Sequence, residues 1–340
     1  MKKMIVPFIL AVLIVGGVVF YATSNSGKKE DNKSSDTVSS IVKKDELKIV
    51  NRNSNSRSIA VMINNHNIAR KNHSGLQDAY IVYEIIVEGG ITRLLAIYKD
   101  KTLERVGSVR SSRHYFLDYA LENDAVYIHW GGSPEAYSDI KTLGINNVDG
   151  IASSKVFFRD KTLDVPLEHT GFLNMTNLKD IFNSKKYRTT SDAGLLLNYS
   201  VPSVEMQDAK DANEIVIRYS NYITDKYVYD SEAKVYKRFV NNEAHTDGVT
   251  KKQYTFKNII AYAIKNKNIV GGRKGRQEIE NIGSGTGVYC SEGKCVDINY
   301  KKTSRSAKTV YTLKNGEELK VNDGNTFIQI YPTSGSITVK

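Results

Sequence analysis

The sequence is poor in the residues on which metal-dependent and nucleophilic enzymes rely. Its 340 residues include two cysteines, one tryptophan, five prolines and six histidines. The histidines show no HExxH or comparable spacing, which argues against a zinc hydrolase. Neither Ser111 nor Ser133 lies in a nucleophile-elbow sequence, so amidase or transpeptidase chemistry is disfavoured. We therefore expect neither a metal nor a cofactor.

The two cysteines predict a disulfide. Cys290 and Cys295 bracket the sequence Ser-Glu-Gly-Lys, which is typical of a hairpin with a four-residue loop. Cysteines on facing strands at the base of such a loop can pair, and the bond persists outside the cytosol. A metal pair would need two further ligands, and no histidine follows His245. The pair indicates an exported protein.

Charge is absent from a long run near the N-terminus. Residues 4–22 carry none and follow Lys2 and Lys3, which predicts a single transmembrane signal-anchor over residues 1–24. A cleavable signal peptide ending near Ser24 is the alternative. No cysteine follows the run, so the bacterial lipoprotein route is closed. Residues 25–57 are polar and read as a flexible spacer. The body of the chain is expected to be extracytoplasmic, at the cell membrane.

Positive charge is in excess but scattered. The formal net charge is +11, yet the sequence contains no helix-turn-helix, zinc finger or RNA-binding signature. We therefore expect no nucleic acid partner. Outside a membrane, the available polyanions are wall polymers and lipid head groups, to which a basic protein is weakly attracted.

Strand and helix patterns predict an α+β fold in two parts. An N-terminal mixed α/β domain, residues 58–212, is built on a β-hairpin and strand-helix units. A β-rich C-terminal domain, residues 213–340, contains short strands separated by Gly- and Asn-rich turns.

The strongest hairpin signal surrounds Gly89 and Gly90, between two runs rich in β-branched and aromatic residues. A two-residue turn at these glycines places Ile86 opposite Arg93. Glu84, Glu88 and Arg93 then share one face of the ribbon, because side chains alternate along a strand. This face is either a cleft or a structural charge cluster, and ion-pair networks also arise without function.

Further candidate residues follow the hairpin. Residues 109–122 read as a helix capped by Ser108, on which Arg110, His114 and Asp118 share one stripe with Arg113 beside it. The arginines could bind an anion near the helix start, or the stripe is an exposed amphipathic face.

A strand over residues 124–130 then leads to a helix with Ser133 as cap and Pro134 as first residue. His129 lies at the end of that strand, either in a site or as a packing residue.

Several sequence blocks resemble a known family. They are Ile59–His66, Ser74–Glu84, Val87–Arg93, Val106–Arg113 and His129–Pro134, with a C-terminal block from Gly283 to Pro332. They look like the YerB-type family, envelope proteins of Gram-positive bacteria with a domain of unknown function and a smaller second domain. The likeness implies a compartment and a domain pattern, and no activity.

Two functions remain open. One is cleavage of peptidoglycan glycan strands, for which Glu84, Glu88 and Asp118 are the candidate catalytic carboxylates. Glu84 and Glu88 lie roughly 13 Å apart along a strand, too far for ordinary two-carboxylate hydrolysis, so a lytic transglycosylase with one glutamate acid/base fits better. Arg93 opposes this role because a nearby cation favours the ionised carboxylate.

The other function is a non-catalytic module that binds a wall polymer or a partner protein. For either function, the candidate binding residues are Arg93, Arg110, Arg113, His129, Asn65 and His66.

Overall fold

The structure is a computed structural model that describes residues 46–153, 155–271 and 275–340. The expected signal-anchor over residues 1–24 lies outside these ranges, as does most of the expected spacer. Among the described residues, no helix is both long enough and apolar enough to cross a membrane.

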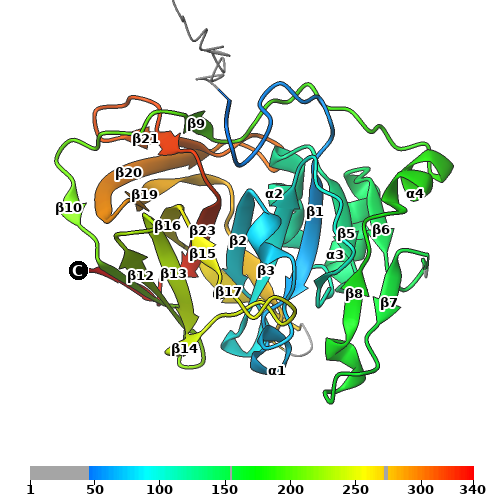
Figure 1. The fold of residues 1–340 in the computed structure, drawn as a ribbon. Coiled ribbons are helices and arrows are strands. Elements are labelled where there is room, and N and C mark those ends of the chain that lie inside the picture. The colour runs from blue at the N-terminus through cyan, green and yellow to red at the C-terminus, as the bar shows by residue number, and fades with distance from the viewer. Residues whose placement is uncertain (1–45, 154, 272–274) are drawn as a thin grey trace, which may run out of the picture. The chain divides into compact units, whose positions relative to one another are not determined.

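A large mixed sheet forms the centre of the unit that spans Lys44–Lys340 (Figure 1). In spatial order its main path runs β10 (Lys210–Asp211), β20 (Lys294–Lys302), β19 (Gly283–Ser291), β16 (Asn258–Ile264), β23 (Thr326–Pro332), β2 (Ile81–Ile86), β3 (Thr92–Tyr98), β1 (Ile59–Asn64), β5 (Val126–His129) and β6 (Asn147–Asp149), and β21 (Val310–Leu313) pairs with β20. Strands from both halves of the sequence therefore share one sheet.

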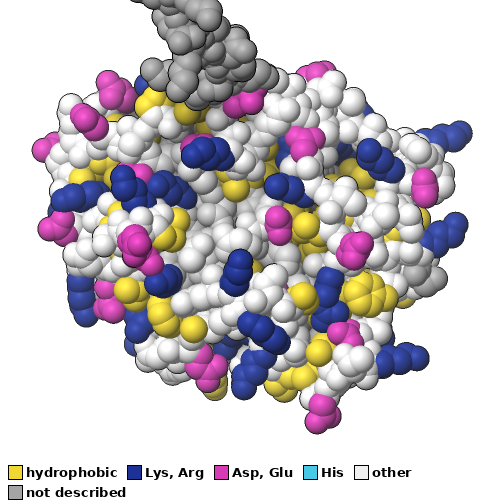
Figure 2. All heavy atoms as spheres, in the orientation of Figure 1, with side chains coloured by type: hydrophobic (Ala, Val, Ile, Leu, Met, Phe, Trp, Pro, Cys, Tyr) yellow, Lys and Arg dark blue, Asp and Glu magenta, His cyan; other side chains and the backbone are white. Residues whose placement is uncertain are grey.

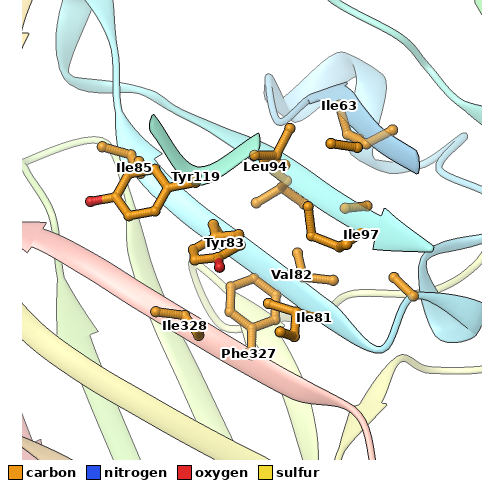
Figure 3. Close-up of a cluster of buried hydrophobic side chains, with 14 of the residues drawn as sticks. Ile63, Ile81, Val82, Tyr83, Ile85, Leu94, Ile97, Tyr119, Phe327 and Ile328 are labelled. Atoms are coloured by element: carbon orange, nitrogen blue, oxygen red, sulfur yellow. The ribbon is translucent and has the colours of Figure 1, made fainter. Parts of the chain in front are cut away.

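The central strands are buried on both faces and mostly apolar, which explains their position. Every residue of β2, β3 and β23 is buried. Strands covered on both sides read as continuous hydrophobic runs rather than as alternating patterns. Phe327 of β23 lies beside Ile81 and Val82 of β2, and Ile328 is paired with Tyr83 (Figure 3). The parallel pairing of β2 with β23 thus joins the two halves of the chain through the core.

A second sheet packs beside the first. It comprises β14 (Glu243–Ala244), β13 (Val235–Val240), β12 (Thr224–Asp230), β11 (Glu214–Arg218) and β24 (Ser336–Val339), with β15 (Thr255–Phe256) paired to β13. Smaller sheets pair β4 (Val106–Gly107) and β7 (Phe157–Arg159) with β8 (Gly171–Leu173), β17 (Asn266–Asn268) with β18 (Gln277–Ile279), and β22 (Lys320–Asn322) with β9 (Asn198–Ser200).

Helices are short and few among the described residues. The α-helices are α1 (Asn67–Arg70), α2 (Leu117–Glu122), α3 (Pro134–Thr142) and α4 (Leu178–Ser184). The 3-10 turns are η1 (Leu76–Asp78), η2 (Glu88–Gly90), η3 (His114–Phe116) and η4 (Leu167–His169). The expected β-rich C-terminal half is confirmed, and the N-terminal half holds fewer and shorter helices than the expected mixed α/β domain.

The predicted register of the central hairpin is wrong by one residue. The loop holds three residues, Glu88 to Gly90, and Ile85 rather than Ile86 lies opposite Arg93. Both glycines have positive φ, 68° and 73°, which accommodates the longer loop. A slip of one residue moves every side chain to the other face, so Glu84 and Arg93 lie on opposite sides of the sheet.

The predicted helix over residues 109–122 is also wrong in its first half. Val109 forms a β-bridge with Ile63, and the Arg110 amide donates to the Met62 carbonyl at 2.9 Å. Because strand partners take these backbone groups, helical structure begins only at His114. The next prediction is confirmed, since Ser133 caps α3 and Pro134 is its first residue.

The predicted disulfide is present, in a tighter hairpin than expected. Cys290 faces Cys295, and Ser291 faces Lys294, so the turn contains Glu292 and Gly293 alone.

The N-terminal spacer is shorter than predicted. Val50 is buried, and the amides of Lys48 and Ile49 donate to the Asp323 carboxylate, so this part of the chain packs on the body.

Candidate functional site

Glu84 lies in a sealed polar network. Its Oε1 accepts hydrogen bonds from Asn65 Nδ2 at 2.9 Å and Thr92 Oγ1 at 2.5 Å, and its Oε2 accepts from Arg238 Nη2 at 2.6 Å. Burial, followed by the charge of Asp225, raises the pKa of Glu84 to about 8. This shift favours the protonated acid, yet the exposed fraction of Glu84 is 0%. No reactant can reach it in this structure.

The network continues into two neutral histidines. Arg238 Nη1 donates to His245 Nδ1 at 2.6 Å, so the proton of His245 lies on Nε2. That proton is shared with His73 Nδ1 at 2.9 Å, and His73 Nε2 donates to the Asn64 carbonyl. Burial lowers the pKa of His73 to about 3, and burial with the charge of Arg238 lowers that of His245 well below its usual value.

On the other side of the sheet, the Glu88 carboxylate forms ion pairs with two arginines. Arg113 holds it through Nε at 2.5 Å and Nη2 at 3.0 Å, and Arg93 Nη2 lies 3.9 Å away. Burial acts to raise the pKa of Glu88, but the hydrogen bond and charge of Arg113, with the charge of Arg93, lower it overall. Glu88 is therefore an ionised carboxylate, unsuited to protonating a leaving group. The predicted gathering of Glu84, Glu88 and Arg93 on one face is wrong.

Asp118 and Arg110 do not share a stripe. Asp118 accepts from Arg305 Nε at 2.6 Å and Asn281 Nδ2 at 2.9 Å, whereas Arg110 lies 3.2 Å from the Glu168 carboxylate. Burial raises the pKa of Asp118. The predicted helical stripe fails because Arg110 precedes the helix.

The remaining candidates serve the local structure. His129 is buried between the Gly131 carbonyl, at 2.8 Å, and Asn147 Oδ1, at 3.2 Å. The Asn65 side chain donates hydrogen bonds to Glu84 and Thr92. His66 caps α1, and its ring stacks on His169 with centroids 5.1 Å apart. The predicted set is thus divided among separate clusters.

A groove beside α1 is the concave surface that these predictions missed. It measures about 560 Å³ and lies between α1, the segment 162–165 and the turn before β14. Most of its lining residues are polar or charged, and the lining comprises Asn67, Ile68, Arg70, Lys71, Asn72, Thr162, Leu163, Asp164, Val165, Asn241 and Glu243. A smaller hollow of about 80 Å³ shares Arg70 and Glu243 with it and reaches His245. α1 and β14 both lie at the lower edge of Figure 1.

One sequence signal pointed to this place. Residues 64–67 form a polar run that begins at the last residue of the buried strand β1, and Arg70 and Lys71 follow within one turn. The opposite wall comes from Asn241 and Glu243, more distant in sequence, and no local pattern could have paired them with α1.

Charges of both signs are interspersed over the face of the molecule shown in Figure 2. Among the residues that the structure describes, no group of three or more histidine, cysteine, aspartate or glutamate side chains is arranged to hold a metal ion.

The fold and sequence define a class of two-domain, β-rich proteins of unknown function. Residues 46–188 match the N-terminal domain of the family "Protein of unknown function (DUF3048)", and residues 215–328 match its C-terminal domain. The chain belongs to this family, and the resemblance drawn from the sequence blocks is confirmed.

A relative comes from Bacillus subtilis strain 168. The chain is 30% identical over 296 residues to the protein named "Putative lipoprotein YerB", covering 85% of this chain and 84% of the relative. The crystal structure of YerB from the same species matches with a TM-score of 0.72 at 27% identity, covering 83% of this chain and 94% of that one.

Proposed function

We propose that this chain is an extracytoplasmic, membrane-tethered protein that binds a cell-wall polymer in the groove beside α1 without cleaving it. The uncharged run over residues 4–22, the disulfide and the lipoprotein name of the relative support the envelope location. We place the body outside the membrane, with the N-terminal segment as its tether.

The groove lining carries the proposal. Amide, hydroxyl and charged side chains surround a volume of about 560 Å³, and they suit a hydrated polymer rich in hydroxyl and amide groups better than an apolar ligand. Catalysis is less well supported, because the two candidate carboxyls with raised pKa values, those of Glu84 and Asp118, are both buried.

Co-sedimentation of the full-length chain, in detergent, with purified sacculi tests the proposal. Lys71→Trp places a large ring in the groove, and Lys141→Trp is the matched control on the exposed surface of α3. We expect the bound fraction to fall at least about fivefold for Lys71→Trp and to stay unchanged for the control.

Two outcomes would overturn the proposal. Release of anhydro-muropeptides by the wild-type chain, lost in Glu84→Gln or Glu88→Gln, would establish a lytic enzyme. Absence of both sedimentation and release would show that the ligand is not a wall polymer, and would favour a partner protein.

A further inference from the structure

Arg70 is a buried cation without a carboxylate partner. Arg70, Arg93 and Arg238 are the buried arginines among the described residues, with exposed fractions of 8%, 7% and 0%. Arg238 pairs with Glu84 and Asp225, and Arg93 lies near Glu88. Within the described ranges Arg70 has no ion pair, and its one hydrogen bond runs from Nη1 to the Asn65 carbonyl at 2.9 Å.

Arg70 lines both hollows, and its guanidinium has four N–H donors besides the one bonded to the Asn65 carbonyl. A guanidinium withdrawn from water is costly unless an anion and hydrogen-bond acceptors compensate it. Burial and the positive charge of Arg238 lower the pKa of Arg70, and the negative charges of Asp225, Glu84 and Glu243 oppose this shift without cancelling it. A ligand carboxylate would supply it, because the planar fork of arginine matches a carboxylate with two parallel hydrogen bonds.

The groove also carries unpaired negative charge. Glu243 and Asp164 line it, both exposed, and neither has an ion-pair partner among the described residues. A polyol phosphate carries charge of one sign along its length and would meet repulsion from these carboxylates. A ligand with both a carboxylate and an ammonium group would find partners for both.

We infer that the groove recognises the peptide stem of peptidoglycan, with Arg70 binding a stem carboxylate and Glu243 or Asp164 binding an ammonium group. This inference rests on the proposed function and names the part of the wall polymer that is bound. The glycan strand then contributes contacts at the rim rather than the main recognition.

Calorimetric titration of the full-length chain in detergent tests the inference. The probes are a disaccharide–tetrapeptide muropeptide with free carboxylates and a free amine, the same disaccharide without peptide, the muropeptide with its carboxylates amidated, and polyglycerol phosphate. We expect the free muropeptide to bind at least about tenfold more tightly than the other three, since they lack the paired charges.

Variants locate the contact. Arg70→Gln should weaken muropeptide binding at least about tenfold, Arg70→Lys by less, and Glu243→Gln by about threefold, while Lys141→Gln leaves it unchanged. Glu243 is exposed, so its substitution tests the site even where an Arg70 variant fails to fold.

Equal binding of the bare disaccharide or the amidated muropeptide would overturn the inference, as would tighter binding of polyglycerol phosphate. Unchanged affinity in both Arg70→Gln and Glu243→Gln would do the same. Sedimentation with sacculi would survive any of these results, so failure here is distinguishable from failure of the proposed function.

Discussion

At the scale of single residues, the buried triad of Glu84, Arg238 and Asp225 shows that a shifted pKa does not by itself mark a reactive site. Arg238 contacts one carboxylate at 2.6 Å and the other at 2.9 Å, and all three side chains have an exposed fraction of 0%. A neutral Glu84 leaves one positive and one negative charge in the network. The arrangement is a structural junction between β2, β12 and β13.

The raised pKa of Glu84 predicts a pH-dependent stability difference. Between its ordinary value of 4.5 and about 8, the folded chain keeps a proton that the unfolded chain has lost. The Glu84 contribution to the free energy of unfolding therefore falls as pH rises through this window, by up to about 1.4 kcal/mol per pH unit. Glu84→Gln does not titrate, so in urea denaturation it should gain stability relative to wild type from pH 5 to pH 8. A constant difference across this range would contradict the assignment.

Substitution of Arg238 should lower the free energy of unfolding far more than substitution of its neighbour Lys237. Arg238→Met leaves the Asp225 carboxylate buried without a cation, and we expect a loss of about 3–5 kcal/mol in the free energy of unfolding. Lys237→Met, on the exposed face of the same strand, should cost less than about 1 kcal/mol. Thermal or urea denaturation measures both, and similar losses in the two variants would contradict this account.

At the scale of elements, local signals located the strands and caps but not their partners. The cap at Ser133, the strand ending at His129 and the paired cysteines all follow from short-range chemistry. The register predicted for the hairpin was wrong because the two glycines are compatible with loops of two or three residues. The helix predicted over residues 109–113 does not form because pairing with β1 and other tertiary partners outweighs a modest helical pattern.

The disulfide should strengthen one hairpin without being needed for the fold. It closes a short loop, with a sequence separation of 5, so the chain-entropy model gives about 2 kcal/mol. We expect the double variant Cys290→Ser with Cys295→Ser to fold and to lose roughly that amount. Urea denaturation of the oxidised wild type against the variant measures it, and complete unfolding of the variant would contradict the expectation.

At the scale of the whole molecule, the two family domains share one sheet. β2 pairs with β23 over residues far apart in sequence, and Gln329 Nε2 donates to Glu84 Oε2 at 3.3 Å across 245 positions. The strand patterns predict a β-rich C-terminal half and a mixed N-terminal half, but they contain no information on which strands meet. The groove was missed for the same reason, since its walls come from separate regions of the chain.

Sharing of the central sheet predicts cooperative unfolding. Separation of β2 from β23 would expose apolar strands on both sides, so neither half should persist when the other unfolds. We expect one calorimetric transition for the folded body, with near-ultraviolet and far-ultraviolet signals that coincide. Two resolved transitions would show that the domains are independent.

Hydrogen exchange of the full-length chain, with and without soluble muropeptides from sacculi, tests most directly where the ligand binds. Amides that a ligand covers or stabilises exchange more slowly. The account predicts slower exchange at residues 67–72, 162–165 and 241–244, with no change at residues 84–93. Protection confined to the hairpin and to residues 110–113 would contradict it and would return the site to the carboxylates and arginines of that region.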